Sequence, residues 1–155
     1  MCQRAWSKRD IRPCSTGRTA ASVKAMETLT HDECVQLLQY QSFVGRVGFV
    51  VDGRPLVLPV NYLAEEDGIV FCTESGTKLS SLSAGAPVAF EVDASRPLYH
   101  SGWSVVVQGT AREIVDPVQL DRLRRGPLKS WAVRPSEHWV RISIDEISGR
   151  KLPES

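Results

Sequence analysis

The chain has 155 residues, 42% of them hydrophobic, which suits one globular domain with a core of its own. Its formal net charge of +1 gives no overall field that would favour nucleic acid or a membrane surface. No apolar run approaches the ~20 residues that a membrane-spanning helix needs.

A basic segment precedes the first clear structural pattern. Residues 1–25 carry six basic side chains and the single acid Asp10, a formal +5, which leaves −4 for the rest of a chain of net charge +1. The segment has no apolar stretch of the kind found in secretory signals, and its like charge favours disorder. Charge alone is a weak argument for nucleic acid. We therefore expect no nucleic-acid partner, and one domain over residues 26–155.

The cysteines and histidines show no metal-binding pattern. The four cysteines are scattered without a CxxC pair, and the three histidines lie far apart in the sequence. These spacings favour neither a zinc site nor a disulfide framework. We expect a cytoplasmic protein with reduced thiols and no metal.

The first predicted elements are a short helix and three strands. Thr30 and Glu33 have the spacing of a capping box, and the apolar stripe that follows predicts a helix ending near Gln41. Alternating apolar residues, separated by turn sequences at 52–53 and 65–68, then predict strands over residues 44–51, 56–63 and 69–73.

The second half of the chain continues the same pattern. A short helix that ends at Gly85 and a helix over residues 116–126 are expected beside a loop over residues 93–102. Three more strands are predicted over residues 88–92, 103–115 and 138–144. Six strands with only short helices predict a mainly β fold, a six-stranded antiparallel barrel.

The stretch from Thr73 to Lys78 has two interpretations. It leads from a strand into a helix through hydroxyls, a glycine and a lysine. Backbone N–H groups at the start of the helix, the hydroxyls of Ser75 and Thr77 and the charge of Lys78 would suit a phosphate. Taken alone, the same residues are more typical of a solvated turn.

Two further stretches are compatible with a flat ligand. Leu58, Pro59, Val60 and Asn61 set a proline in a strand, where it marks either a bulge that frees backbone groups or a plain edge strand. Trp103 and Ser104 would flank an aromatic ring system, although a tryptophan in a core or interface is the more common reading.

The order of these stretches resembles the pyridoxamine 5′-phosphate oxidase-like family of FMN-binding split barrels. The resemblance covers residues 29–150, and its landmarks are GRVGFVVDGRPLVLPVNY, GIVFCTESGTKLSSL, VAFEVD, GWSVVVQGTAREI and VRISIDEISGR. Each landmark is modest alone, whereas their joint order is specific. Within the family, the chain looks most like the branch of nitroimidazole-reductase-like proteins and their deazaflavin-using relatives.

The resemblance implies a homodimer with FMN in the groove between two six-stranded barrels. It assigns the FMN phosphate to Thr73, Thr77 and Lys78, with Ser75 beside them, and the flavin ring to Leu58–Asn61. Ser104, together with Trp103, would reach the flavin from the partner subunit. The expected function is an oxidoreductase acting on a small molecule, with no catalytic side chain identified. A deazaflavin-dependent reductase and a flavin- or haem-binding carrier or sensor are the alternatives.

The sequence departs from the true oxidases at the site that binds the substrate phosphate. Pro55 stands where they carry an arginine, Val60 where they carry a lysine, and Thr77 where an arginine precedes the lysine of the phosphate site. These departures argue against oxidation of pyridoxamine phosphate.

We expect a chain that begins at Met26 to keep the melting temperature and the cofactor content of the full chain, because residues 1–25 lack apolar periodicity. Thermal unfolding and absorption spectra of the two proteins test this. A fall of several degrees would show that the segment packs on the domain.

Overall fold

The architecture is that of a mainly β protein. In a computed structural model, the structure describes residues 25–40, 44–74, 82, 84–96, 98, 101–126, 128 and 137–152. The helices and strands are, in chain order, β1 (Glu27–Thr28), α1 (His31–Tyr40), β2 (Val44–Val51), β3 (Arg54–Glu65), β4 (Gly68–Glu74), β5 (Ala84–Arg96), β6 (Ser101–Glu113), α3 (Pro117–Arg125), β7 (Glu137–Ile142) and β8 (Glu146–Leu152).

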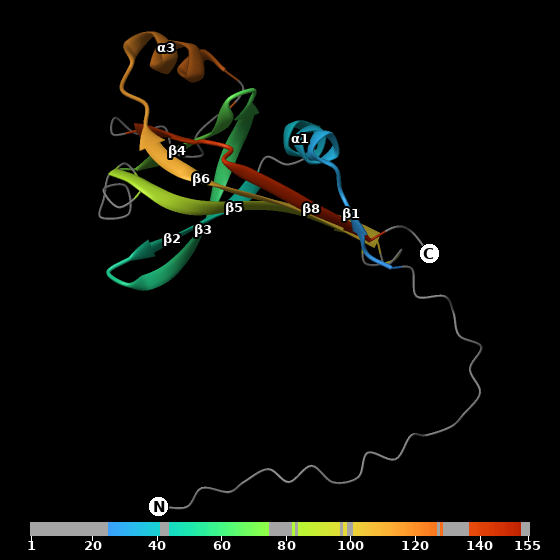
Figure 1. The fold of residues 1–155 in the computed structure, drawn as a ribbon. Coiled ribbons are helices and arrows are strands. Elements are labelled where there is room, and N and C mark those ends of the chain that lie inside the picture. The colour runs from blue at the N-terminus through green and yellow to red at the C-terminus, as the bar shows by residue number, and fades with distance from the viewer. Residues whose placement is uncertain are drawn as a thin grey trace, which may run out of the picture.

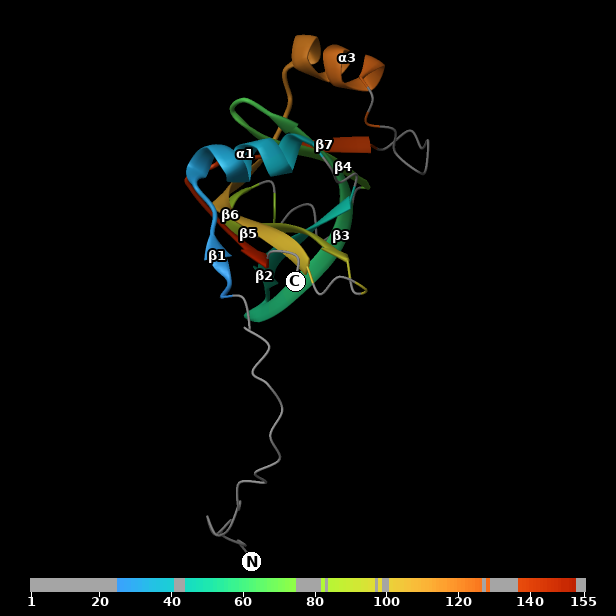
Figure 2. The same ribbon diagram turned by 90° about the vertical axis from the view of Figure 1, so that its right-hand side faces the viewer.

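Six of the strands close into an antiparallel barrel. They pair in the order β6, β5, β2, β3, β4 and β7, and β7 pairs again with β6. Helix α1 lies beside β8, and α3 stands beyond β4 and β7 (Figure 1) (Figure 2). The six-stranded antiparallel barrel expected from the sequence is confirmed.

One edge of β6 binds two strands in succession. Near its C-terminal end β6 pairs with β7, and from Gly102 to Gln108 it pairs with β8. The chain leaves β7 at Ile142 and re-enters the sheet at Glu146, with the amide of Asp145 donating to the carbonyl of Gln108 at 3.0 Å. The last strand was expected over residues 138–144, whereas β7 ends two residues earlier, at Ile142. Strand β8 was not expected.

The barrel core is formed by the inward-facing residues of the alternating strands. Fully buried members include Val47, Ile69, Phe71, Phe90, Val105, Val107, Val140 and Ile142. A second cluster on the outer face of β4 and β7 contains Val70 and Trp139, and α3 covers it with Leu123. The short helix α3 thus buries an apolar part of the outer face of the barrel.

Local signals position the two helices. Glu33 accepts a hydrogen bond from the amide of Thr30 at 2.8 Å and donates its own amide to the Thr30 hydroxyl at 3.4 Å, which confirms the capping box. The hydrogen bonds that the Glu33 carboxylate accepts from the amide and the hydroxyl of Thr30 lower the pKa of Glu33. Asp116 caps α3 by accepting from the amide of Val118 at 3.3 Å.

One expected loop and one expected end of a helix are wrong. Residues 93–96 and 101–102, expected in a loop, continue β5 and β6, because Asp93 pairs with Ser104 and Arg96 with Ser101. Gly85, expected to cap a helix, lies within β5 at an irregularity of the ladder, and its φ of 82° is the positive angle that a glycine adopts without strain.

None of the helices in the described ranges is long and apolar enough to cross a membrane.

We expect Gly109→Ala to lower the free energy of unfolding by about 1–3 kcal/mol, the usual range for overpacking. A Cβ at this position would collide with the backbone oxygen of Ser143 and lie 2.9 Å from its carbonyl carbon. Urea unfolding measures the effect. Gly48→Ala is the matched control, since its nearest neighbour would be 3.7 Å away. Equal stability of the two variants would contradict the prediction.

Candidate functional site

Strands β3 and β4 separate halfway along their length. Their ladder ends at the pair Tyr62–Phe71, although both strands continue. Continued in the same register, that ladder would place Val60 opposite Thr73. The predicted site residues Leu58–Asn61 and Thr73 thus flank one separation in the barrel wall.

The proline in β3 lies on the length of that strand that pairs with β2 but no longer with β4. Pro59 pairs with Arg46 in a ladder between β2 and β3 that has no shift in register from Val44 to Val51. The structure therefore shows no bulge at Pro59, and the edge-strand interpretation is the one that the register supports. Because proline has no N–H group, an edge is where it costs least.

An imidazole–carboxylate pair lies next to Thr73. Thr73 and His138 are partners across the β4–β7 ladder, so their side chains share one face of the sheet. The alternation from buried Phe71 and Val140 makes this the inner face. Nδ1 of His138 lies 2.6 Å from a carboxylate oxygen of Glu113, and both side chains are about one-third exposed. This hydrogen bond leaves Nε2 of His138 as the ring nitrogen that can exchange a proton at the end of the barrel.

Three of the predicted phosphate ligands, Ser75, Thr77 and Lys78, lie outside the described residues. Their assignment stays a prediction.

Trp103 and Ser104 belong to opposite faces of β6. Trp103 packs against the barrel core, whereas Ser104 belongs to the outer face, since successive side chains of a strand alternate. Ser104 pairs with Arg150 of β8 and with Asp93 of β5. These residues line a hollow of about 300 Å³ that Trp103 also borders.

The rim of this hollow is charged. Arg46 donates to Asp93 at 2.7 Å and to Glu91 at 2.9 Å, and the two acids raise the pKa of the Arg46 guanidinium. Arg150, also at the hollow, is a second cation on this outer face. The arrangement can bind a polar ligand through guanidinium and hydroxyl groups.

The structure does not bring all predicted residues together within one chain. Between β3, which carries Asn61, and β6, which carries Ser104, the sheet contains β2 and β5. Three inter-strand steps correspond to about 14 Å. This path along the barrel wall separates the two groups of residues, which therefore form two separate half-sites within one chain.

Tyr62 fixes α1 to the strand that carries the first half-site. Its hydroxyl donates to the carbonyl of Leu38 at 3.0 Å, and its ring packs edge-on against Phe90 with centroids 4.9 Å apart. Burial raises the pKa of Tyr62 to about 12. The phenol therefore stays neutral and serves as a hydrogen-bond donor.

The residues on the two sides of the separation between β3 and β4 suit a flat ligand better than a nucleophilic reaction. A strand edge lies along one side, and a hydroxyl and an imidazole lie along the other. Cys72, the neighbouring thiol, packs with the outer cluster beneath α3. The described part of the predicted site is therefore the β3 edge with Thr73 and His138.

The comparisons with known proteins identify the family of the chain. Residues 30–151 match the family model described as pyridoxamine 5′-phosphate oxidase. An uncharacterized protein of Mycobacterium tuberculosis is 32% identical over 147 residues, which cover 92% of this chain and 95% of that protein. The chain therefore belongs to the pyridoxamine 5′-phosphate oxidase family, as its sequence predicted.

Two solved structures have the same fold. The FAD-binding protein from Mycobacterium smegmatis is 32% identical, with a TM-score of 0.72 and coverage of 83% of this chain and all (100%) of that one. The FAD-binding protein from Mesorhizobium loti is 26% identical, with a TM-score of 0.72 and coverage of 84% and 100%.

The sequence analysis missed His138, Glu113, Asp93 and Arg150. His138 and Glu113 are 25 positions apart and follow no motif, so only the pairing of β7 with β4 and β6 reveals them. Arg150 follows from the register of β8, a strand whose polar sequence gives no alternating signal.

We expect Tyr62→Phe to destabilise the protein by about 1–3 kcal/mol, because it leaves the Leu38 carbonyl without its donor. Between about pH 10 and 12 the unfolded chain loses the phenol proton while the native state keeps it, so the wild type loses stability as pH rises. Urea unfolding across this range should show the gap between wild type and variant narrowing. A difference in the free energy of unfolding that stays constant with pH would contradict the burial of the Tyr62 hydroxyl.

Proposed function

We propose that the protein is a flavin-dependent oxidoreductase that binds FMN at the interface of a homodimer. The observation that carries the proposal is the separation between β3 and β4, where Leu58–Asn61 and Thr73 lie on opposite sides. The two relatives described as FAD-binding support a flavin of some kind. FMN is preferred because the stretch Ser75–Lys78 suits one terminal phosphate.

The proposed binding mode uses both half-sites. In one subunit, the β3 backbone holds the ring, and Thr73, Thr77 and Lys78 hold the phosphate. Ser104 of β6 in the partner would complete the site, with Arg150 beside it. A bound flavin would supply hydride transfer, while this chain binds, orients and shields the ring.

His138 gives the proposed site one group that can move a proton. Its Nδ1 is held by Glu113 at 2.6 Å, which orients the ring. Nε2 can then give or take a proton on the side of the sheet that carries Thr73. The small-molecule substrate differs from pyridoxamine phosphate, because Pro55 and Val60 offer no charge for a substrate phosphate.

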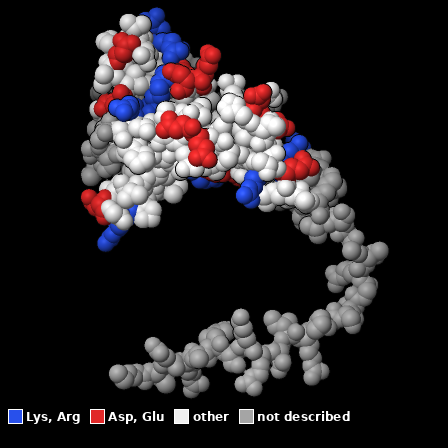
Figure 3. Space-filling view, viewed as in Figure 1, with Lys and Arg blue, Asp and Glu red and all other residues white. Residues whose placement is uncertain are grey.

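The outer surface of the barrel supports association. The region of the β2–β3 hairpin is largely uncharged apart from its tip, whereas charges of both signs are interspersed over the rest of this face (Figure 3). Val50 and Val57 on the hairpin are 61% and 59% exposed. Exposed apolar patches are typical of interfaces. We propose a cytoplasmic location, which the free thiol of Cys34 suits.

The identity of the cofactor is tested by mass spectrometry of the small molecule that co-purifies. FMN supports the proposal. A deazaflavin indicates the alternative reductase, and tight flavin binding without reduction of any acceptor indicates a carrier or sensor. A colourless protein that binds no flavin on titration would contradict all three.

We expect Lys78→Ala to weaken FMN binding roughly ten- to a hundredfold, since a hydrogen bond to a charged group contributes about 1.5–3 kcal/mol. Quenching of flavin fluorescence measures the dissociation constant. Arg124→Ala on α3 removes an exposed cation elsewhere and should bind FMN like the wild type. Equal constants for all three proteins would refute the phosphate assignment.

We expect Val106→Glu to dissociate the dimer and release the flavin, because it places a charge on the outer face of β6, next to Ser104 and opposite Glu91. Size exclusion with detection at the flavin band measures both effects. Val118→Glu, at a valine that is 77% exposed on α3, is the matched control. A folded Val106→Glu monomer with stoichiometric flavin would defeat the proposal.

A further inference from the structure

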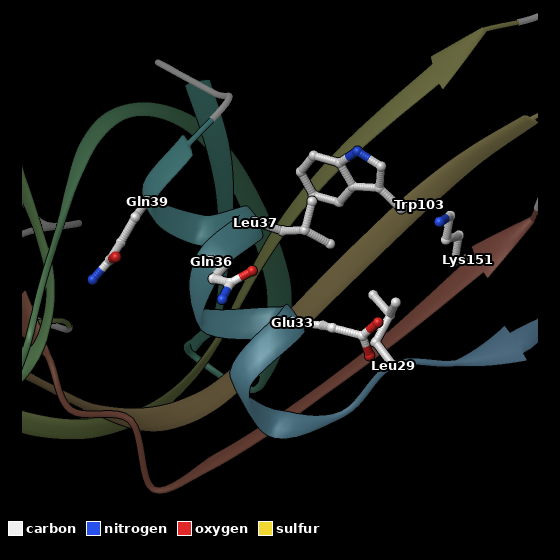
Figure 4. Close-up of a pocket in the computed structure, with 7 residues that line it drawn as sticks. All are labelled: Leu29, Glu33, Gln36, Leu37, Gln39, Trp103 and Lys151. Carbon is white, nitrogen blue, oxygen red and sulfur yellow. The ribbon is translucent and has the colours of Figure 1, made fainter.

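A groove of about 580 Å³ lies between α1 and the strands β6 and β8. Small-molecule sites typically have volumes of ~300–1,000 Å³. Leu37 reaches from α1 toward the indole ring of Trp103, and Lys151 extends from β8 beside that ring (Figure 4). The residues that line the groove are Leu29, Glu33, Gln36, Leu37, Gln39, Trp103 and Lys151.

Helix α1 divides its residues between the core and the groove. Cys34 and Leu38, four residues apart, are buried in the core. Glu33 and Leu37, also four residues apart, lie on the neighbouring stripe and line the groove. One wall of the groove is therefore a helix face whose position is set by core packing.

A glycine in β8 allows helix α1 to lie close to that strand. A Cβ on Gly149 would lie 2.7 Å from the sulfur of Cys34 and 2.8 Å from Leu29. The amide of Leu29 also donates to the carbonyl of Gly149 at 3.0 Å. These contacts fix the floor of the groove in the folded chain, so the cavity is part of the fold.

The lining combines a flat apolar wall with polar groups. The indole of Trp103 and the side chains of Leu29 and Leu37 are apolar. Gln36 and Gln39 add amide groups that donate and accept hydrogen bonds. Lys151 is exposed, and its ammonium forms no ion pair within 4.0 Å among the residues that the structure describes.

The one carboxylate of the groove is already engaged. Oε2 of Glu33 accepts from both the amide and the hydroxyl of Thr30, each at 2.8 Å. The hydrogen bonds from Thr30 and, to a smaller extent, the charge of Lys151 lower the pKa of Glu33, so this carboxylate keeps its negative charge in the groove. Lys151 is the only cation among the described residues that line the groove, and its N–H donors face a ligand of opposite sign.

We propose that this groove binds a planar aromatic compound with an anionic substituent, its ring against Trp103 and its charge at Lys151, at a site separate from the flavin site. An indole face prefers flat ring systems. The proposal assigns Trp103 to this groove and not to the flavin, although the resemblance paired it with Ser104. Trp103 packs toward the core side of β6, whereas Ser104 belongs to the outer face. The proposal does not depend on flavin binding.

The test uses two fluorescent probes on the full chain. 8-Anilinonaphthalene-1-sulfonate carries a flat naphthalene ring and a sulfonate, and N-phenyl-1-naphthylamine has the same rings without the sulfonate. We expect saturable binding of the sulfonate at one site per chain. Lys151→Gln should weaken the sulfonate roughly three- to fivefold and leave the neutral probe unchanged, as for an exposed ion pair.

Substitutions of Trp103 test the flat wall. Trp103→Leu should weaken both probes about tenfold, whereas Trp103→Phe, which keeps an aromatic ring, should stay within about threefold of wild type. Arg124→Gln is the matched control, because Arg124 is an exposed cation at a different surface hollow, on α3. Circular dichroism establishes that each variant is folded.

Several results would overturn the proposal. The first is a wild type that does not bind the sulfonate, and the second is a Lys151→Gln variant that binds it as tightly as the wild type. The third is a folded Trp103→Leu variant that binds both probes as tightly as the wild type; if Trp103→Leu does not fold, the result for Lys151→Gln decides. Displacement of the sulfonate by saturating FMN would show that the groove belongs to the flavin site. Failure to bind FMN while the sulfonate still binds would instead count against the proposed function alone.

Discussion

Closure of the barrel depends on three residue pairs between β6 and β7. They are Ala111 with Ile142, Arg112 with Arg141 and Glu113 with Val140. The chain can turn away directly after them because Gly109 has no side chain to meet the backbone of Ser143. Without that close approach, the segment after β7 could not continue along the same edge of β6 as β8. The β8 wall of the groove that contains Lys151 follows from this one crossing.

The same closure of the barrel brings the polar residues of the candidate site together. Because β7 lies between β4 and β6, it brings His138 next to Thr73 on one side and within reach of Glu113 on the other. No motif in the sequence joins these three residues. Strand β4 follows β7 rather than β3 beyond Phe71, and the barrel wall therefore opens beside Val60. The open wall and the imidazole–carboxylate pair thus both result from the pairing of β7 with β4 and β6.

The alternating apolar pattern predicted the barrel because its six strands bury one face each. It failed where strands have no apolar face. Residues 93–96 are polar or small, yet they stay in β5 because β6 offers backbone partners. Strand β8 has a polar sequence and a glycine, so it has no signal of its own. Gly85 was expected to end a helix, whereas it lies in β5 at an irregularity of the ladder.

The candidate site was predictable in part for the same reason. Motif order identified Leu58–Asn61 and Thr73, which the structure places across one opening. It did not reveal that Trp103 and Ser104 face opposite ways, although the alternation of a strand implies it. Contacts made only through pairing, such as His138 with Glu113, require the register of strands that are distant in sequence.

The two prolines of β3 have a consequence for how the protein behaves in a crowded solution. Where β3 leaves β4, it presents an edge, and unpaired strand edges recruit strands from other molecules and start aggregates. Pro55 and Pro59 lie on that length of β3 and cannot donate to an incoming strand. At the other end of the sheet, β8 is covered by the two-residue β1 and carries Glu146, Arg150 and Lys151. Both edges resist strand addition, so the wall can remain open to a small molecule without becoming a seed for fibrils.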